Sequence, residues 1–198
     1  MFNILLDELP EEWNGYKIDV DFQIGIMISQ CMADEELSKA ERIYTAIGLL
    51  FPDEENRPLS IDEALDGISW FLNDWNHDNL PKSNKKSDQI VVMDFDIDQW
   101  RIYAAFKKQY AIDLNTEPLH FWVFMGLLSN LEGCNFTEVI SIREKKIDSK
   151  MSKEEKEHLR KAKNIYRITK NSDTEETQEE KAERQKAIDE FNRIRNKS

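Results

Sequence analysis

The stretch LHFWVFMGLLSNL, residues 119–131, contains the longest apolar run in the chain, the eight residues from 121 to 128. The side chains of such a run cannot all face one side of a helix, so a helix here must be covered by protein all round. Eight residues also fall far short of the roughly 20 that a membrane-spanning helix needs. We therefore expect residues 119–131 to form the central helix of a mainly α, compact multi-helix bundle with no membrane span.

A helix-start signal recurs on both sides of this central helix. A Ser or Thr is followed three residues later by Glu at Ser38, Ser60, Ser152 and Thr177. In such a capping box the hydroxyl and the carboxylate satisfy N–H groups that have no partner inside the helix. We expect helices over residues 39–51, 61–75 and 153–168, and a last helix after Thr177. The apolar stripe of the helix over 61–75 is expected at Ile61, Ala64, Leu65, Ile68, Leu72 and Trp75.

The other helices are expected to begin at acidic, proline or asparagine residues. Asp19 or Asp21 opens a helix over 22–32, and one of Asp94, Asp96 and Asp98 opens a helix to about residue 110. Residues 116–118, TEP, are expected to start the central helix, Gly133 to end it, and Asn135 to open a helix through residue 142. Residues 76–88 are polar and are expected to form a loop, and residues 90–93 are either a short strand or the lead-in to a helix.

The N-terminal region has a strand pattern in place of a helix pattern. Asn14-Gly15 lies between Trp13 and Tyr16, and both central positions of this pair readily adopt a positive φ. We expect a short β-hairpin here, packed on the helices because two strands are marginal alone.

Charge divides the chain unevenly and predicts its domain organisation. The formal net charge is −12, but residues 1–144 hold 11 Lys and Arg against 27 Asp and Glu, whereas residues 145–170 hold 10 against 4. An acidic body with a basic segment is compatible with intramolecular docking, self-association or a charged partner. The expected units are a helical core with the hairpin over residues 1–147, a basic helix over 148–170, and a polar tail over 171–198. The tail helix has only four apolar residues, Ala187, Ile188, Phe191 and Ile194, so it either docks on a partner or frays.

Known catalytic and metal-binding motifs do not occur in the sequence. The three histidines are far apart, and no HExxH or Cys-x-x-Cys pattern is present. Residues 94–98, DFDID, alternate carboxylates as a calcium loop does, but Gln99 and Ala105 stand where that loop needs Gly and Glu. Cys31 and Cys134 lie in apolar stretches, and the start of the chain has no basic segment typical of a signal peptide. We expect reduced cysteines, a cytoplasmic location, no cofactor and no enzymatic activity.

The basic stretch and the aromatic residues are the candidate contact surfaces. A nucleic-acid site should combine a basic patch with stacking aromatics, but only Tyr166 lies among the basic residues, so a solvated or protein-binding face is favoured. The aromatic residues exceed what one small core requires, which indicates either core packing or a groove for an amphipathic helix of a partner. The candidate partner-contact residues are Trp70, Trp75, Trp100, Tyr103, Phe106, Phe121, Trp122, Arg143, Arg160, Lys163 and Arg167.

Eight short segments, in this order and spacing, resemble the bacteriophage "gene product fifteen" family of long-tailed phages and prophages. They are ILLDELP at 4–10, DF at 21–22, WF at 70–71, IYAAF at 102–106, QY at 109–110, IDL at 112–114, LHFW at 119–122 and IR at 142–143. The resemblance spans about residues 3–166, and Phe121 stands where members usually have a second Trp.

The resemblance implies a gene between those of the major tail protein and the tape-measure protein. Proteins from that position act as tail assembly chaperones that coat the helical tape measure until tail-tube protein replaces them. It therefore implies a chaperone in the host bacterial cytoplasm, with the tape-measure protein or other tail proteins as partners and a homo-oligomer also open. The alternatives are a structural or connector component retained in the virion and a nucleic-acid-binding regulator.

Overall fold

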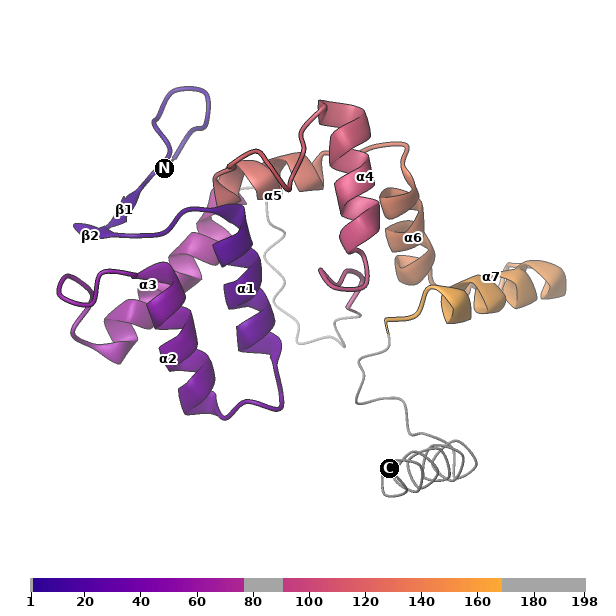
Figure 1. The fold of residues 1–198 in the computed structure, drawn as a ribbon. Helices are drawn as coiled ribbons and strands as arrows, with labels where there is room; N and C mark the ends of the chain where they lie inside the picture. The colour runs from indigo at the N-terminus through magenta and orange to yellow at the C-terminus, as the bar shows by residue number, and fades with distance from the viewer. Residues whose placement is uncertain (1, 77–90, 169–198) are drawn as a thin grey trace, which may run out of the picture.

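The computed structural model describes residues 2–76 and 91–168, and this part of the chain is mainly α-helical, as the sequence predicts (Figure 1). Seven α-helices account for most of it: α1 (Phe22–Ala33), α2 (Lys39–Leu50), α3 (Ile61–Asn73), α4 (Gln99–Tyr110), α5 (Phe121–Ser129), α6 (Asn135–Glu144) and α7 (Lys153–Ile165). The remaining elements are the strands β1 (Glu12–Trp13) and β2 (Tyr16–Lys17) and a 3-10 turn, η1 (Asp74–Asn76). None of the helices described is long and apolar enough to span a bilayer. The expected loop over 77–88 and the helix after Thr177 lie outside the described residues.

The predicted helix starts at serine residues are confirmed. Ser38 and Ser152 each accept a hydrogen bond from the backbone N–H three residues on, and Glu41 and Glu155 complete the two capping boxes. Ser60 accepts from the Glu63 N–H at 3.1 Å and opens α3, while the Asp21 carboxylate caps α1 through the Gln23 N–H at 2.8 Å. Each of these signals involves residues within three positions of one another, so it depends little on the rest of the fold.

The hairpin is also confirmed, and it rests on the helices. Asn14 and Gly15 have φ values of 49° and 85°, as a tight two-residue hairpin turn requires. The rings of Trp13 and Tyr16 each lie 6.3 Å from the ring of Phe51, which follows α2. The two strands are therefore stabilised by aromatic packing against the end of α2.

Helix α5 occupies the centre of the molecule, as its apolar sequence predicts. It packs on α1, α4 and η1, and Phe121, Trp122, Phe124 and Leu128 are buried. Its predicted ends are wrong. The helix begins after His120, whose Nδ1 accepts from the Trp122 N–H at 3.0 Å. Thr116 and Glu117 instead belong to a preceding turn, in which their N–H groups donate to the Asp113 carbonyl. It ends at Ser129, and Gly133 lies in the following loop.

Two further expectations need correction. The buried side of α3 is formed by Ala64, Gly67, Ile68 and Phe71, because Phe71 packs against Phe121 of α5, and Ile61 is left exposed. Helix α6 is capped one residue earlier than predicted, since the Cys134 N–H donates to the Thr137 hydroxyl at 3.3 Å.

A buried ion pair joins α4 to α6. Asp98 precedes α4, but its carboxylate does not cap that helix; it accepts from Arg143 Nη1 at 2.6 Å and Nη2 at 3.1 Å. Asp98 is 0% exposed and Arg143 is 5% exposed. Arg143 also donates to the carbonyl oxygens of Val92, at 2.9 Å, and Tyr166, at 2.6 Å. One guanidinium thus holds four separate parts of the chain together.

The helices fall into two groups around α5 (Figure 1). Helices α1, α2 and α3 pack together on one side, and α4 and α6 pack together on the other. Helix α7 contacts α6 and otherwise extends away from the body, and its last turn comes back to Arg143. This arrangement leaves a hollow between α1 and α4.

Candidate partner-binding groove

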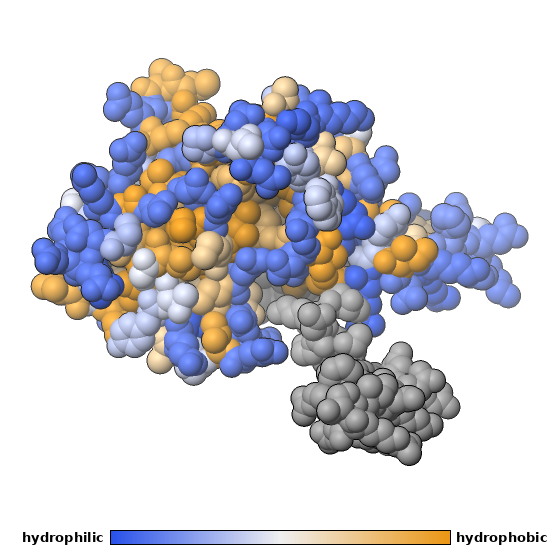
Figure 2. All heavy atoms as spheres, in the orientation of Figure 1, coloured by the Kyte–Doolittle hydropathy of each residue, from blue (hydrophilic) through white to orange (hydrophobic). Residues whose placement is uncertain are grey.

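The hollow between α1 and α4 is an open groove with a volume of about 340 Å³. We call it the α1–α4 groove. Figure 2 shows hydrophobic atoms over the α1–α3 side and again near the start of α4. Apolar and aromatic residues of its lining include Phe22, Ile26, Phe95, Trp100 and Phe124, and polar residues of its lining are Gln23, Gln30, Asp96, Gln99 and Asn115. A hollow with this lining can accept apolar side chains of another helix.

Trp100 is the most accessible ring of the groove. It lies in the first turn of α4 and is 73% exposed, although a Trp of this size normally buries much of its surface. Its ring meets Tyr103 edge to face at 5.9 Å between centroids. Large exposed aromatic residues beside a hollow are typical of binding surfaces.

The orientation of Tyr103 is fixed by an exposed polar cluster. Its hydroxyl donates to Asp113 Oδ1 at 3.2 Å, and Lys107 Nζ donates to Asp113 Oδ2 at 2.8 Å. The Lys107 hydrogen bond is the main reason that the pKa of Asp113 is lowered, and the same bond raises the pKa of Lys107. Both groups therefore stay charged at neutral pH and keep Tyr103 facing the groove.

Phe95 separates the groove from a second hollow of about 400 Å³ between α1, α3 and α5. Its ring lies 6.2 Å from that of Phe124. Gln30 of α1 donates to Asp96 Oδ1 at 2.7 Å and bridges the two sides of the groove. Among the described residues that line the α1–α4 groove, Asp96 alone is charged, so this lining carries a negative charge beside its apolar surface.

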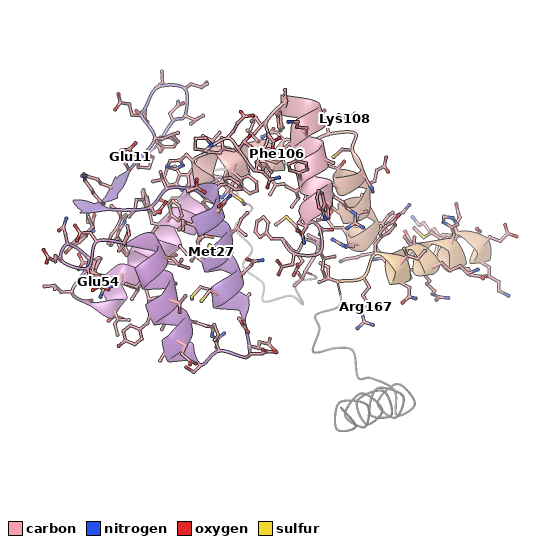
Figure 3. All side chains as sticks on the ribbon, viewed as in Figure 1. Glu11, Met27, Glu54, Phe106, Lys108 and Arg167 are labelled. Carbon is pink, nitrogen blue, oxygen red and sulfur yellow. The ribbon has the colours of Figure 1, made fainter. Side chains whose placement is uncertain are left out.

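The aromatic residues predicted as partner contacts fall into two groups, those that line the groove and those that pack in or against the core. Trp100 and Tyr103 line the groove. Phe106, Phe121 and Trp122 do not line it, because their side chains are buried in the core. Phe106, labelled in Figure 3, points from α4 toward α5 and stacks on Phe124 at 5.2 Å.

Trp70 and Trp75 lie outside the groove as well. Both are half-buried and pack against the core. Trp70 meets Trp122 edge to face at 5.0 Å, and the Trp122 indole in turn donates to the Phe71 carbonyl at 2.7 Å. The surplus of rings is thus explained mostly by an aromatic core around α5.

The basic residues predicted as contacts have three different environments. Arg143 is buried in the ion pair with Asp98, so the structure gives this side chain a role inside the fold. Lys163 is half-buried and donates to the Arg143 carbonyl at 2.6 Å. Arg160 and Arg167 are exposed and remain available to a partner.

Sequence reasoning missed four groove residues and an exposed loop. Phe22, Ile26, Phe95 and Leu114 line the groove, yet each has the hydrophobicity of an ordinary core position. Residues 4–6, ILL, protrude with Leu5 87% exposed, on a turn in which the Asn3 carbonyl accepts from the Leu6 and Asp7 N–H groups. The run of three aliphatic residues before acidic ones was the available signal.

The described residues offer no arrangement for metal chemistry. Within 2–76 and 91–168, no three His, Cys, Asp or Glu side chains lie together as a metal site would require. Cys31 and Cys134 are both free thiols.

Comparison with known proteins gives one match. Residues 5–168 match the model of a protein family described as bacteriophage Gp15 protein. No curated protein and no solved structure matches the chain significantly. The matched range contains every helix described and all residues of the α1–α4 groove.

Proposed function

The chain belongs to the family of bacteriophage Gp15 proteins, and from that premise we propose that it is a non-catalytic tail assembly chaperone. Its partner is the tape-measure protein, whose amphipathic helices bind in the α1–α4 groove. The observation that carries the proposal is the groove itself, an open hollow lined by both aromatic and polar side chains, with Trp100 exposed at its edge. A long helical partner presents apolar side chains every three or four residues, and a groove of this kind can shield them from water.

The charge of the molecule supports the same role. A strongly acidic protein stays soluble and repels other copies, so its complex with an aggregation-prone partner also stays in solution. Assembly takes place in the host bacterial cytoplasm in this proposal. Because tail-tube protein must displace the chaperone, the interface is of moderate affinity and dissociates readily.

Co-expression with the neighbouring tape-measure gene tests the proposal. We expect the tape-measure protein to be soluble with the wild-type chain and to precipitate with Trp100→Ala, which removes the exposed ring of the groove. Tyr44→Ala is the matched control, because Tyr44 is 64% exposed on α2 and does not line the groove. Equal solubility of the tape measure with and without the wild-type chain would contradict the proposal.

Mass spectrometry of purified particles distinguishes the chaperone from a structural component. A chaperone leaves the complex during assembly, so we expect its peptides to be absent or scarce in finished virions. A stoichiometric amount in the virion would instead favour a connector protein that remains in the tail.

A further inference from the structure

The N-terminal segment presents three aliphatic side chains to solvent on an ordered turn. Residues 4–6, ILL, are 57%, 87% and 81% exposed in that order. The Asn3 N–H donates to Asp7 Oδ2 at 2.7 Å, and the Asn3 carbonyl accepts from the Asp7 N–H at 2.8 Å. Before the turn, the ring of Phe2 lies 5.0 Å from that of Trp122. The segment is therefore held in shape and loses little conformational entropy when it binds another surface. We call residues 3–7 the aliphatic turn.

Acidic side chains follow the aliphatic turn. Residues 2–16 contain Asp7, Glu8, Glu11 and Glu12 but no Lys or Arg, and all four acidic residues are exposed. Figure 2 shows hydrophobic atoms at the tip of this N-terminal loop. Exposed aliphatic side chains beside carboxylates are complementary to a partner surface that carries both apolar and basic groups.

The C-terminal part of α7 has the opposite charge and also exposes an aliphatic side chain. Residues 158–168 contain four Lys and Arg but no Asp or Glu, and we call them the basic end of α7. Ile165 is 74% exposed, and Lys161 lies four positions before it on the same side of the helix. Lys161 pairs with Glu157 at 2.9 Å, but their side chains are 72% and 61% exposed, so this pair contributes little and Lys161 can bind another carboxylate. Arg160 is exposed as well.

These two surfaces lie at opposite ends of the molecule. In Figure 1 the N-terminal loop lies at one end, and α7 projects beyond α6 at the other. The aliphatic turn therefore cannot reach the basic end of α7 in its own chain while the described fold is intact. We propose that it binds this end of α7 in a second copy. Leu5 and Leu6 pack against Ile165, and the carboxylates that follow the turn pair with Arg160 and Lys161.

A contact between two different surfaces does not stop at a dimer. A pair of copies still has one free turn and one free α7, so further copies add until a ring closes or an open chain grows. The net charge of −12 opposes association, but salt at physiological ionic strength screens exposed charges beyond about 8 Å, whereas charges in contact are screened much less. Because each surface comprises few residues, the contact is weak and forms mainly at high protein concentration. This inference does not depend on the α1–α4 groove or on the tape measure.

Sedimentation equilibrium of the full-length chain tests the proposal. Leu5→Gln and Ile165→Gln each remove one apolar contact, and Leu59→Gln is their matched control, because Leu59 is 99% exposed and belongs to neither surface. We expect the average mass of the wild type and of Leu59→Gln to rise with concentration beyond that of a dimer. Leu5→Gln and Ile165→Gln should each associate about tenfold more weakly. Arg160→Glu should weaken association to a similar extent, whereas Lys39→Glu, the same charge reversal on α2, should not.

An equimolar mixture of Leu5→Gln and Ile165→Gln gives the second measurement. The first variant retains an intact α7 and the second an intact turn, so together they should form one wild-type contact and stop at a dimer. A wild-type chain that remains monomeric up to about 1 mM overturns the proposal, and so does a mixture that associates no better than its components. Association that only one of the two substitutions weakens overturns it too, because the turn and α7 then do not bind each other. None of these measurements involves the tape-measure protein, so their failure is distinct from failure of the chaperone role.

Discussion

Arg143 donates to Asp98 at 2.6 and 3.1 Å and to the carbonyls of Val92 and Tyr166, all in a buried environment. Removing one partner of a buried ion pair is costly because the other charge stays in a poorly hydrated site. We expect Arg143→Met to lower the free energy of unfolding by about 3 kcal/mol, measured by urea denaturation.

Two further variants test whether the loss of stability in Arg143→Met comes from the buried charge of Asp98. Arg101 also contacts Asp98, at 2.8 Å, but its side chain is 26% exposed, so Arg101→Met should cost only about 1 kcal/mol. Asp98→Asn combined with Arg143→Met removes the buried charge that Arg143 no longer neutralises, and this double variant should be more stable than Arg143→Met alone. If the double variant is the less stable one, the buried charge is not the cause of the loss.

His120 links folding to pH. Its Nδ1 accepts from the Trp122 N–H at 3.0 Å and its Nε2 lies 3.1 Å from the Pro10 carbonyl oxygen, so the neutral ring with a proton on Nε2 satisfies both contacts. Burial lowers the pKa of His120 below its ordinary value of 6.5. The unfolded chain therefore takes up a proton first as the pH falls, and stability is lost from about pH 6.5 down to the lowered pKa of the folded state.

His120→Asn tests this pH dependence, because Asn is a strong N-cap but does not titrate. We expect its urea midpoint to change less between pH 7.5 and pH 5.5 than that of the wild type. His158→Asn is the control, since His158 is exposed on α7 and takes no part in the α5 cap. An unchanged pH dependence in His120→Asn would contradict the role given to His120.

At the level of elements, α1 and α5 approach each other closely at Gly25. A Cβ atom at this position would overlap the ring of Phe121, whereas a Cβ at Gly48, on the exposed side of α2, would meet nothing within 4 Å. Gly25→Ala should therefore lower the free energy of unfolding by about 1–3 kcal/mol through overpacking. Gly48→Ala should raise it by about 0.5–1 kcal/mol, because Ala is the better helix former. Thermal unfolding of the two variants compares the same substitution in both contexts.

Helix ends and turns could be predicted from the sequence where the interactions that form them join neighbouring residues. The capping boxes at Ser38 and Ser152 and the Asn14-Gly15 turn involve neighbouring residues, so the sequence was sufficient for them. The start of α5 was wrong because the cap is His120, and its ring is also held by Pro10, 110 positions away in the sequence.

The candidate site was predictable only in part for the same reason. Trp100 and Phe106 both lie on α4, yet one is exposed and the other fully buried, because α5 covers only one side of that helix. The surplus of aromatic residues indicated a groove, but the sequence could not assign each ring to groove or core. Arg143 was grouped with the basic surface because its partner Asp98 is 45 positions away.

For the whole molecule, Phe124 is the side chain that connects the two groups of helices. It is 1% exposed and stacks on Phe22 of α1 at 4.9 Å and on Phe106 of α4 at 5.2 Å. Phe124→Ala should destabilise the fold by about 3–5 kcal/mol and increase amide exchange in α2 and α6 together. Phe51→Ala is the matched control, because Phe51 is equally buried but packs at the hairpin, with Trp13 and Tyr16.

The two substitutions separate global from local unfolding. We expect Phe51→Ala to increase amide exchange chiefly in α2 and α3. The amides of α6 should stay better protected in Phe51→Ala than in Phe124→Ala. If Phe124→Ala affects only one group of helices, α5 does not couple them.

The contacts of Arg143 have a consequence for the order in which the protein matures on the ribosome. Asp98 and the whole of α4 are translated before Arg143, and the Tyr166 carbonyl that Arg143 also binds is translated later still. A nascent chain that has emerged only as far as α5 contains Asp98 with the partly exposed Arg101 as its guanidinium partner, but without the buried guanidinium of Arg143. The last contacts of the C-terminal half can therefore form only after Tyr166 has left the ribosome, so α4 and α6 are fastened together after both helices have been synthesised.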